Sequence, residues 1–521
     1  MADGRWWPLV VLPFFAVGLS RVFRALVPAE DRPRAGRLVA LASALRVAVA
    51  VLLYTGSLAA GWGGFIPGDD AGYAQFARVF VAWLKGELDP ALGRPWADEA
   101  DVFNTWVYLE SAIFFVIGPE VLVPILLNGV FAMVASLLVF DVVRRLFDRR
   151  AALLALALTA FYPSLVLWTS LNLKDALSLL LIMVCLWSLV RFQDRALWVP
   201  LIVAFAAALL LQSMRHYLFV GLVLLIPIAV AVAPRLAREM RVRWAGGAAL
   251  VSAILLIISG LVAGVDPRLL ETSERVRQGM TVGARTAYVQ PPPLVVYEGD
   301  TFVVASPEPT GVPSAGPTVS PPAGDVIHVL PNTRIEIASG GPRASPAPGT
   351  VLVRPGDLVV VGTAARTAAP IEARKVLRLP PGSSSAVLVD GSSGAAVLIR
   401  EALRDLPSGA LFALLGPFPW LFERQLDMLV LSEMIVWYAC LVGFAATLAR
   451  ERRRWAALAP LALFLIGMLA LFSIVEGNWG TLFRHRAIVV PTLIAIASPS
   501  LVRIARTRTA DPVFQQQGVV G

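Results

Sequence analysis

Long apolar runs separated by short polar segments occupy residues 6–265 and 429–504. A helix needs roughly 20 apolar residues to cross the hydrocarbon core of a bilayer, where its backbone amides must all be hydrogen-bonded internally. Eleven runs are expected to span: 6–26, 38–60, 119–142, 151–169, 174–192, 196–213, 216–233, 246–264, 429–449, 457–475 and 486–504. The pattern predicts an α-helical polytopic membrane protein with about 11 transmembrane helices. For the first run, which contains Pro8 and Pro13, a re-entrant or interfacial course is the alternative.

Arginines gather in every second loop between these runs. They lie within 21–37, 144–150, 191–195, 235–243, 450–454 and 503–508. Because Lys and Arg are enriched in cytoplasmic loops, we expect these segments in the cytoplasm. The alternate loops are then on the outer side: 68–73, 168–175, 212–217, 265–428 and 476–486.

The stretch 62–118 is predicted to be an outer loop that does not span the membrane. In "YAQFARVFVAWLKGEL" one helical stripe carries Tyr73, Phe76, Phe80, Trp83 and Leu84. Such a helix lies either in the membrane interface or against the transmembrane helices, and the sequence leaves both alternatives open.

Residues 266–428 differ from the rest in composition. Thirteen of the 38 prolines lie between Pro291 and Pro348, and three β-prone runs are bounded by Pro, Gly and Ser: "LVVYEGDTFVVAS", "DVIHVLPNTRIEIAS" and "GTVLVRPGDLVVVGT". This pattern predicts a small β-rich extracytoplasmic insert. The expected domains are a transmembrane module at 1–265, a Pro-rich β domain at 266–405, a second transmembrane module at 406–508 and a cytoplasmic tail at 509–521.

Composition agrees with the membrane assignment. The chain is 57% hydrophobic and 16% charged, with a mean hydropathy of +0.72, unlike a soluble globular domain. The net charge of +9 does not indicate nucleic-acid binding, because the arginines lie in short clusters between apolar runs. Cys185 and Cys440 fall inside apolar runs and are expected to be core residues rather than a disulfide or a metal pair.

The outer loops outside the β-rich insert hold few cations, at the ends of predicted spans: Lys174, Arg215, Arg484 and Arg486. Asp69 and Asp70, in "FIPGDDAGY", lie on the same side. A lone cation at a helix end usually reaches the lipid headgroups, and an acid at a helix start usually caps the helix. Anchoring and capping are therefore the structural alternatives, whereas the convergence of both charges on one side favours a binding site.

A carboxylate combined with several cations suits a substrate that is amphipathic and anionic. A sugar linked to a polyprenyl phosphate fits, with its lipid tail between helices and its phosphate on Arg, Lys and protonated His. The carboxylate would take a proton from an acceptor hydroxyl as this attacks the anomeric carbon. One acid is enough, because the phosphate already leaves as a stabilised anion.

Three segments, "GDDAGYAQFA", "FYPSLVLWTSLNLKDALSLLLI" and "NWGTLFRHRAIVVP", resemble outer-loop patterns of the GT-C class of membrane glycosyltransferases. The resemblance is greatest to a bacterial branch similar to protein mannosyltransferases and the aminoarabinose transferase. In the first segment it implies Asp69 as the catalytic base, Asp70 as the alternate and Tyr73 as a substrate contact. The class often ends in a soluble domain, whereas this chain has its β-rich insert before the last three spans.

The other two segments supply the remaining implied contacts. Trp168 and Asp175 are expected to bind substrate, and Lys174 the donor phosphate. Further phosphate ligands are expected from the last outer loop: Arg484, His485 and Arg486. The loop "QSMRHY" is expected to add Arg215 for the phosphate and His216 for the substrate, because it lies on the same outer side. No cofactor is required by this scheme; a divalent cation beside Asp69 and Asp70 is left open, and no metal site is predicted.

The resulting prediction is an inverting, hexosyltransferase-type enzyme in the bacterial cytoplasmic membrane. It would transfer a sugar from a polyprenyl-phosphate donor to the hydroxyl of a lipid, glycan or protein acceptor on the outer face. The product would serve protein glycosylation or cell-envelope polysaccharide. Membrane lipids are expected to surround the protein, and no nucleic-acid partner is expected. The alternatives are a transporter or flippase for lipid-linked saccharide and a surface-polysaccharide polymerase or ligase. A transporter would be favoured by matching halves with broken helices, and the sequence shows no convincing repeat of that kind.

Overall fold

The computed structural model describes residues 6–65, 68–87, 104–194, 197–259, 428–475 and 479–509, eight short strands between 294 and 389, and a few positions within 407–416. The chain divides into two compact units. The first, which we call the helical unit, comprises 1–262, 423–468 and 484–521, and the second comprises 263–422 and 469–483.

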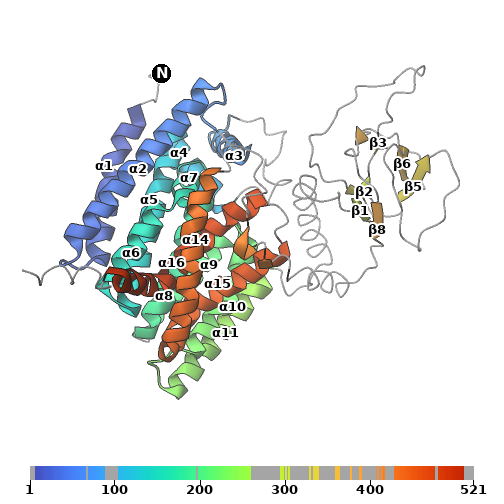
Figure 1. Cartoon of the computed structure of the whole chain (residues 1–521). Helices are drawn as coiled ribbons and strands as arrows, with labels where there is room; N and C mark the ends of the chain where they lie inside the picture. The colour runs from blue at the N-terminus through green and yellow to red at the C-terminus, as the bar shows by residue number, and fades with distance from the viewer. Residues whose placement is uncertain are drawn as a thin grey trace, which may run out of the picture. The chain divides into compact units, whose positions relative to one another are not determined.

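The helices of the described chain follow the predicted apolar runs (Figure 1). They are α1 (Trp7–Leu26), α2 (Arg32–Ala59), α3 (Gly68–Leu84), α4 (Thr105–Ile117), α5 (Leu122–Leu146), α6 (Arg149–Phe161), α7 (Pro163–Trp168), α8 (Asp175–Asp194), α9 (Trp198–Leu211), α10 (His216–Ala231), α11 (Arg238–Ile258), α14 (Met428–Arg450), α15 (Trp455–Val475) and α16 (Trp479–Thr509). Among the described residues, eight helices are long and apolar enough to cross a membrane. The prediction of a polytopic helical membrane protein is confirmed. The runs at 196–213 and 216–233 form the shorter helices α9 and α10.

The expected single span at 151–169 is wrong, because the helix breaks before Pro163. Asp148 caps the start of α6 by accepting hydrogen bonds from the backbone N–H groups of Arg150 and Ala151. At the other end Tyr162 is extended, with φ −62° and ψ 122°, and α7 begins at Pro163. A residue that precedes proline is disfavoured in the helical region, and proline has no N–H to continue the ladder. The break brings the chain into the short loop between α7 and α8.

Burial separates central helices from peripheral ones within the helical unit. In α5 and α8 most side chains are buried, whereas α1 buries only Pro8 and α11 only Ala248 and Ser252. The exposed side chains of α1 and α11 include large apolar ones such as Leu9 and Val242. Exposed apolar helix faces of this kind suit contact with lipid.

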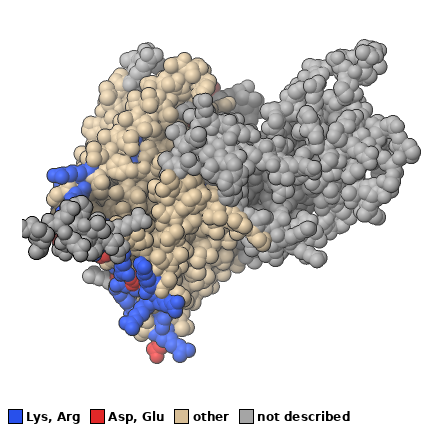
Figure 2. All heavy atoms as spheres, viewed as in Figure 1, with Lys and Arg blue, Asp and Glu red and all other residues tan. Residues whose placement is uncertain are grey.

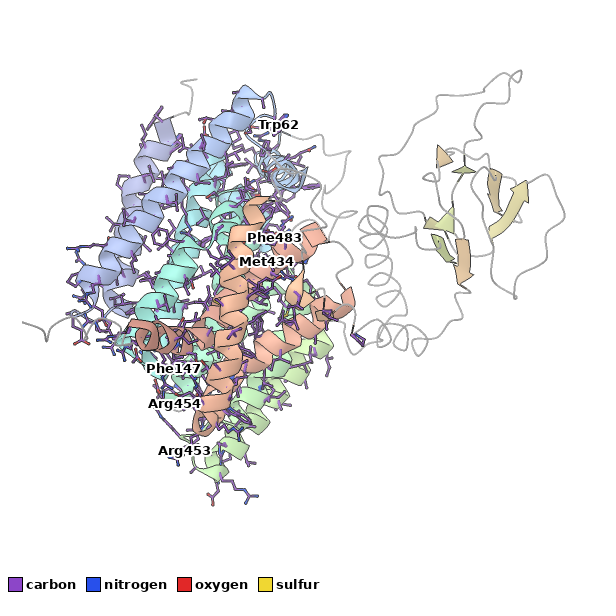
Figure 3. The ribbon with its side chains drawn as sticks, in the orientation of Figure 1. Trp62, Phe147, Met434, Arg453, Arg454 and Phe483 are labelled. Carbon is purple, nitrogen blue, oxygen red and sulfur yellow. The ribbon has the colours of Figure 1, made fainter. Side chains whose placement is uncertain are left out.

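Ion pairs join the basic loops at one end of the helical unit, which we call the basic end. Asp31, between α1 and α2, is fully buried and pairs with Arg144 (3.0 Å) and Arg149 around the α5–α6 turn. Arg454 donates to the backbone oxygen of Leu146 (2.9 Å). Figure 2 shows Lys and Arg gathered at this end while the flank in view carries almost no charge. Figure 3 places Arg453 and Arg454 there and Trp62 at the other end.

The two ends of α8 mark the two ends of the helical unit. Asp194, its last residue, pairs with Arg145 (3.1 Å) and Arg235 at the basic end. Asp175, its first residue, lies 19 positions away in the helix, which corresponds to about 28 Å along the axis. This separation matches the hydrocarbon thickness of a bilayer. The loop before α8 therefore faces the side opposite the basic loops; that this side is the outer one stays a prediction.

Helices α3 and α4 lie within 62–118, and Thr105–Ile117 is too short to count among the eight candidate spans. Asp70, Ala74, Ala77 and Val81 form the buried face of α3. Ser111 of α4 donates a hydrogen bond to the Ala77 backbone oxygen at 3.4 Å. This face is thus packed on other helices, which agrees with the second of the two alternatives, a helix that lies against the transmembrane helices. Because α3 begins at Gly68, Asp70 lies in its first turn rather than at the N-cap.

The strands lie within the predicted β-rich insert. They are β1 (Leu294–Tyr297), β2 (Asp300–Thr301), β3 (Val303–Val304), β4 (His328–Val329), β5 (Thr333–Ala338), β6 (Leu358–Thr363), β7 (Val376–Leu377) and β8 (Ala386–Val389). β1 pairs with β8 in parallel, β2 with β4 antiparallel, and the third sheet has the order β5-β6-β3-β7. The longest ladder is antiparallel and runs from Thr333↔Thr363 to Ala338↔Leu358. The extracytoplasmic position of the insert and its boundaries at 266 and 405 stay predictions.

Candidate active site

The loop between α7 and α8, residues 169–174, organises the candidate site. Asn128 of α5 donates hydrogen bonds from Nδ2 to the backbone oxygens of Leu171 (2.8 Å) and Leu173 (2.9 Å). Buried loop carbonyls need such donors, because no helix or sheet partner satisfies them. The loop is thereby fixed against the central helix α5, and Asn172 and Lys174 are held at defined positions.

Helix α7, which leads into this loop, is held at its start by a buried acid. Glu433 of α14 accepts hydrogen bonds from the backbone N–H and the Oγ of Ser164, both at 2.8 Å. A carboxylate at a helix N-terminus satisfies free N–H groups and the helix dipole. Glu433 is buried inside the helical unit, with 4% of its surface exposed.

Two carboxyl side chains and one amide form what we call the acid cluster: Asp70, Glu110 and Asn172. All three are buried, with 1%, 0% and 0% of their surface exposed. The Nδ2 group of Asn172 donates to the Asp70 backbone oxygen (3.2 Å) and to Oε1 of Glu110 (2.8 Å). The amide thus joins the first turn of α3 to α4 through the α7–α8 loop.

Glu110 was not predicted as a site residue. Burial raises its pKa to about 8, with a further raising contribution from the Asp70 charge, while the Asn172 hydrogen bond and Arg78 lower it. Near neutral pH the side chain is therefore largely protonated. A single acid within the apolar run "TWVYLESAIFFVI" was the available signal, because burying such a group is costly unless it has a purpose.

A second group, which we call the Asp175 cluster, gathers charged residues from three separate segments. Asp175 accepts hydrogen bonds from Nε of Arg484 (2.9 Å) and from Arg215, and it also pairs with Nη2 of Arg484 (2.8 Å). The Nη1 atom of Arg215 donates to the Tyr217 hydroxyl (2.8 Å) and lies 3.0 Å from Nε2 of His485. Arg215 and Asp175 are both 7% exposed.

Aromatic rings connect the two clusters. The Lys174 ammonium lies 5.6 Å from the centre of the Tyr73 ring, and the Arg484 guanidinium lies 5.7 Å from the centre of the Trp168 ring. Both distances are within the range of cation–π attraction. In the sequence, Lys174 comes two positions after Asn172 of the acid cluster and immediately before Asp175.

The structure thus brings together eight of the residues expected from the sequence: Asp70, Tyr73, Trp168, Lys174, Asp175, Arg215, Arg484 and His485. Two others make different contacts. Arg486 faces α14, with its guanidinium 4.9 Å from the Trp437 ring and 3.6 Å from the Met434 sulfur. His216 contacts Phe219 on its own helix, with ring centres 5.8 Å apart. The Asp69 side chain lies outside the described residues.

By its named members, the Asp175 cluster holds more basic side chains than acidic ones. One carboxylate faces two guanidinium groups, with His485 beside them. The arginines of the cluster offer N–H donors that suit an anion. Among the described residues, no group of three or more His, Cys, Asp or Glu side chains could hold a metal ion.

Comparison with known proteins gives one family. Residues 106–262 match the family described as dolichyl-phosphate-mannose-protein mannosyltransferase. The matched segment runs from α4 through α11 and contains Glu110, Asn172, Lys174, Asp175 and Arg215. No curated protein matches the chain. Together with the apolar helices, the family match supports a membrane glycosyltransferase.

Proposed function

We propose that this protein is an inverting glycosyltransferase that moves a sugar from a polyprenyl-phosphate donor to an acceptor hydroxyl on the outer face of the cytoplasmic membrane. The observation that carries the proposal is the Asp175 cluster, in which two arginines compete for one buried carboxylate. The acid cluster lies next to it along the same short loop. The match of residues 106–262 to the mannosyltransferase family supports the reaction class.

The donor phosphate is assigned to Arg484, Arg215 and His485. A sugar phosphodiester carries one negative charge, which suits the guanidinium groups of the Asp175 cluster. Arginine presents paired N–H donors that fit phosphate oxygens, and Asp175 holds both arginines in place before the donor arrives. Trp168, beside Arg484, and Tyr73, beside Lys174, offer flat faces for the sugar.

The reaction breaks the bond between the anomeric carbon and the phosphate oxygen. The acceptor oxygen forms the new bond to the anomeric carbon on the opposite face, its proton passes to a carboxylate base, and the bonding electrons leave with the phosphate. The released monoester approaches a charge of −2 near neutral pH. The guanidinium groups of Arg215 and Arg484 would therefore stabilise the leaving group more as the bond breaks, which is where catalysis needs it.

Asp69 is the proposed base and Asp70 the alternate. The Asp70 carboxyl is 1% exposed and belongs to the buried acid cluster, which suits a supporting role for this residue. Asp69 precedes it in the first turn of α3, on the same side of the helical unit as the loop 169–174. This assignment extends the resemblance of "GDDAGYAQFA" to the first outer loop of the GT-C class.

The test is sugar transfer in proteoliposomes that contain a polyprenyl-phosphate sugar and an acceptor extract. Asp69→Asn is expected to abolish transfer while donor binding and folding persist, and Asp194→Asn, at the basic end, serves as the matched control that keeps activity. Full turnover by both Asp69→Asn and Asp70→Asn would remove the assigned base. Movement of intact lipid-linked saccharide across the membrane without a glycosylated product would identify a transporter instead.

A further inference from the structure

A cavity lies in the helical unit, between the lipid-facing helix α1 and the central helix α5. It has a volume of about 450 Å³, is lined by residues of α1, α2 and α5, and touches Thr169 of the α7–α8 loop. Its lining is apolar except for Ser43, Arg46 and Thr169. The volume falls within the roughly 300–1,000 Å³ typical of small-molecule sites. An apolar space of this size suits a hydrocarbon chain.

Arg46 gives this cavity one positive charge. The residue is 2% exposed, its Nη1 donates to the Ala160 backbone oxygen, and the same atom contacts the Met133 sulfur at 3.5 Å. Its Nε and Nη2 atoms are buried and have no hydrogen-bond partner within the described part of the chain, and Ser43 Oγ is likewise unsatisfied there. No described carboxylate forms an ion pair with it. A buried guanidinium without a counter-charge is costly, so an anion is the missing partner.

The depth of Arg46 restricts which anion can reach it. It lies fourteen residues after Arg32 in α2, about 21 Å along the axis and near the middle of the helix. The phosphate of an ordinary phospholipid stays at the membrane surface, well away from the centre of a core of about 30 Å. An anion at this depth must therefore be small and attached to a single chain.

The cavity is reached from the side. Leu9 lines it and is 71% exposed, and α1 buries only Pro8. A lipid-facing helix thus forms the outer wall, so a hydrocarbon chain can enter directly from the bilayer without crossing the membrane surface.

We propose that this cavity binds one fatty acid, with its chain between α1 and α5 and its carboxylate on Nε and Nη2 of Arg46. These two nitrogens form one edge of the guanidinium and match the two oxygens of a carboxylate. The hydroxyl of Ser43 supplies a further donor. The site is independent of the proposed glycosyl transfer.

The test uses the full chain, purified in an uncharged detergent and titrated with oleate under native mass spectrometry. One oleate per chain is expected, and oleyl alcohol, which has the same chain without the charge, should bind at least tenfold more weakly. Arg46→Gln should lower oleate affinity at least tenfold. Arg37→Gln, which removes an exposed charge from the same helix, should leave it unchanged.

A second variant covers the case in which Arg46→Gln does not fold. Ala16→Trp fills the cavity from α1 without touching the charge, and it should also lower oleate affinity at least tenfold. Equal binding of oleate and oleyl alcohol, unchanged oleate binding by Ala16→Trp, or displacement of oleate by phosphatidylglycerol at equal concentration would each overturn the proposal.

Discussion

Replacing Asp175 by Asn tests whether the Asp175 cluster depends on a buried counter-charge. The substitution keeps the shape of the side chain but removes the charge that faces Arg215 and Arg484. Loss of one partner from a buried ion pair costs about 3–5 kcal/mol, because the remaining charge is left uncompensated away from water. Arg215 is 7% exposed, so the full range is expected to apply to the free energy of unfolding.

The same helix supplies a matched control. Asp194 also pairs with two arginines, Arg145 and Arg235, but its side chain is 27% exposed compared with 9% for that of Asp175. Asp194→Asn should therefore cost no more than about 1 kcal/mol. The assay is chemical unfolding of both purified variants and the parent chain in the same detergent.

An added anion separates the electrostatic explanation from simple loss of packing. If uncompensated arginines cause the loss, a short-chain polyprenyl phosphate should raise the stability of Asp175→Asn more than that of the parent chain. Equal unfolding free energies for the Asp175→Asn and Asp194→Asn variants would refute the reasoning. So would a polyprenyl phosphate that stabilises both chains by the same amount.

Two further predictions concern the pH response and the arginines of α16. Burial raises the pKa of Glu110 to about 8 from its ordinary value of 4.5, so the folded chain holds a proton that the unfolded chain releases. The free energy of unfolding of the parent chain, relative to that of Glu110→Gln, should then be greatest below pH 4.5 and fall as pH rises to about 8, by at most about 1.4 kcal/mol per pH unit. Chemical unfolding of both chains across this pH range measures the difference. A difference that stays constant with pH would contradict the prediction. Arg484→Gln should raise the donor KM about tenfold or more through loss of a charged hydrogen bond, whereas Arg486→Gln should mainly lower the melting temperature. The opposite pattern in transfer and melting assays would show that the two roles are reversed.

The spans could be predicted from the sequence because hydropathy is a local property. An apolar run of sufficient length must bury its backbone amides in a helix, whatever its neighbours are. For the same reason the arginine-rich loops were predicted to share one side, and the ion pairs from Asp31 and Asp194 gather them at one end. Arg215 and Arg484 were recognised because cations are rare among the outer loops, and Asp175 because its segment resembles an outer loop of the GT-C class.

What the sequence could not provide is which of these charges meet. Asp175 contacts Arg215 and Arg484, which lie 40 and 309 positions further along the chain. Nothing in the local sequence distinguishes Arg484, which contacts Asp175, from Arg486, which contacts Trp437 instead. Their helical positions differ by about 200° around α16, so helix packing alone decides their neighbours. The sequence of this chain thus determined which segments enter the membrane, because that depends on each segment's own composition. Only the tertiary structure decided that Asn172 joins Asp70 to Glu110 and that Arg46 faces a cavity, because those contacts depend on how separate helices pack.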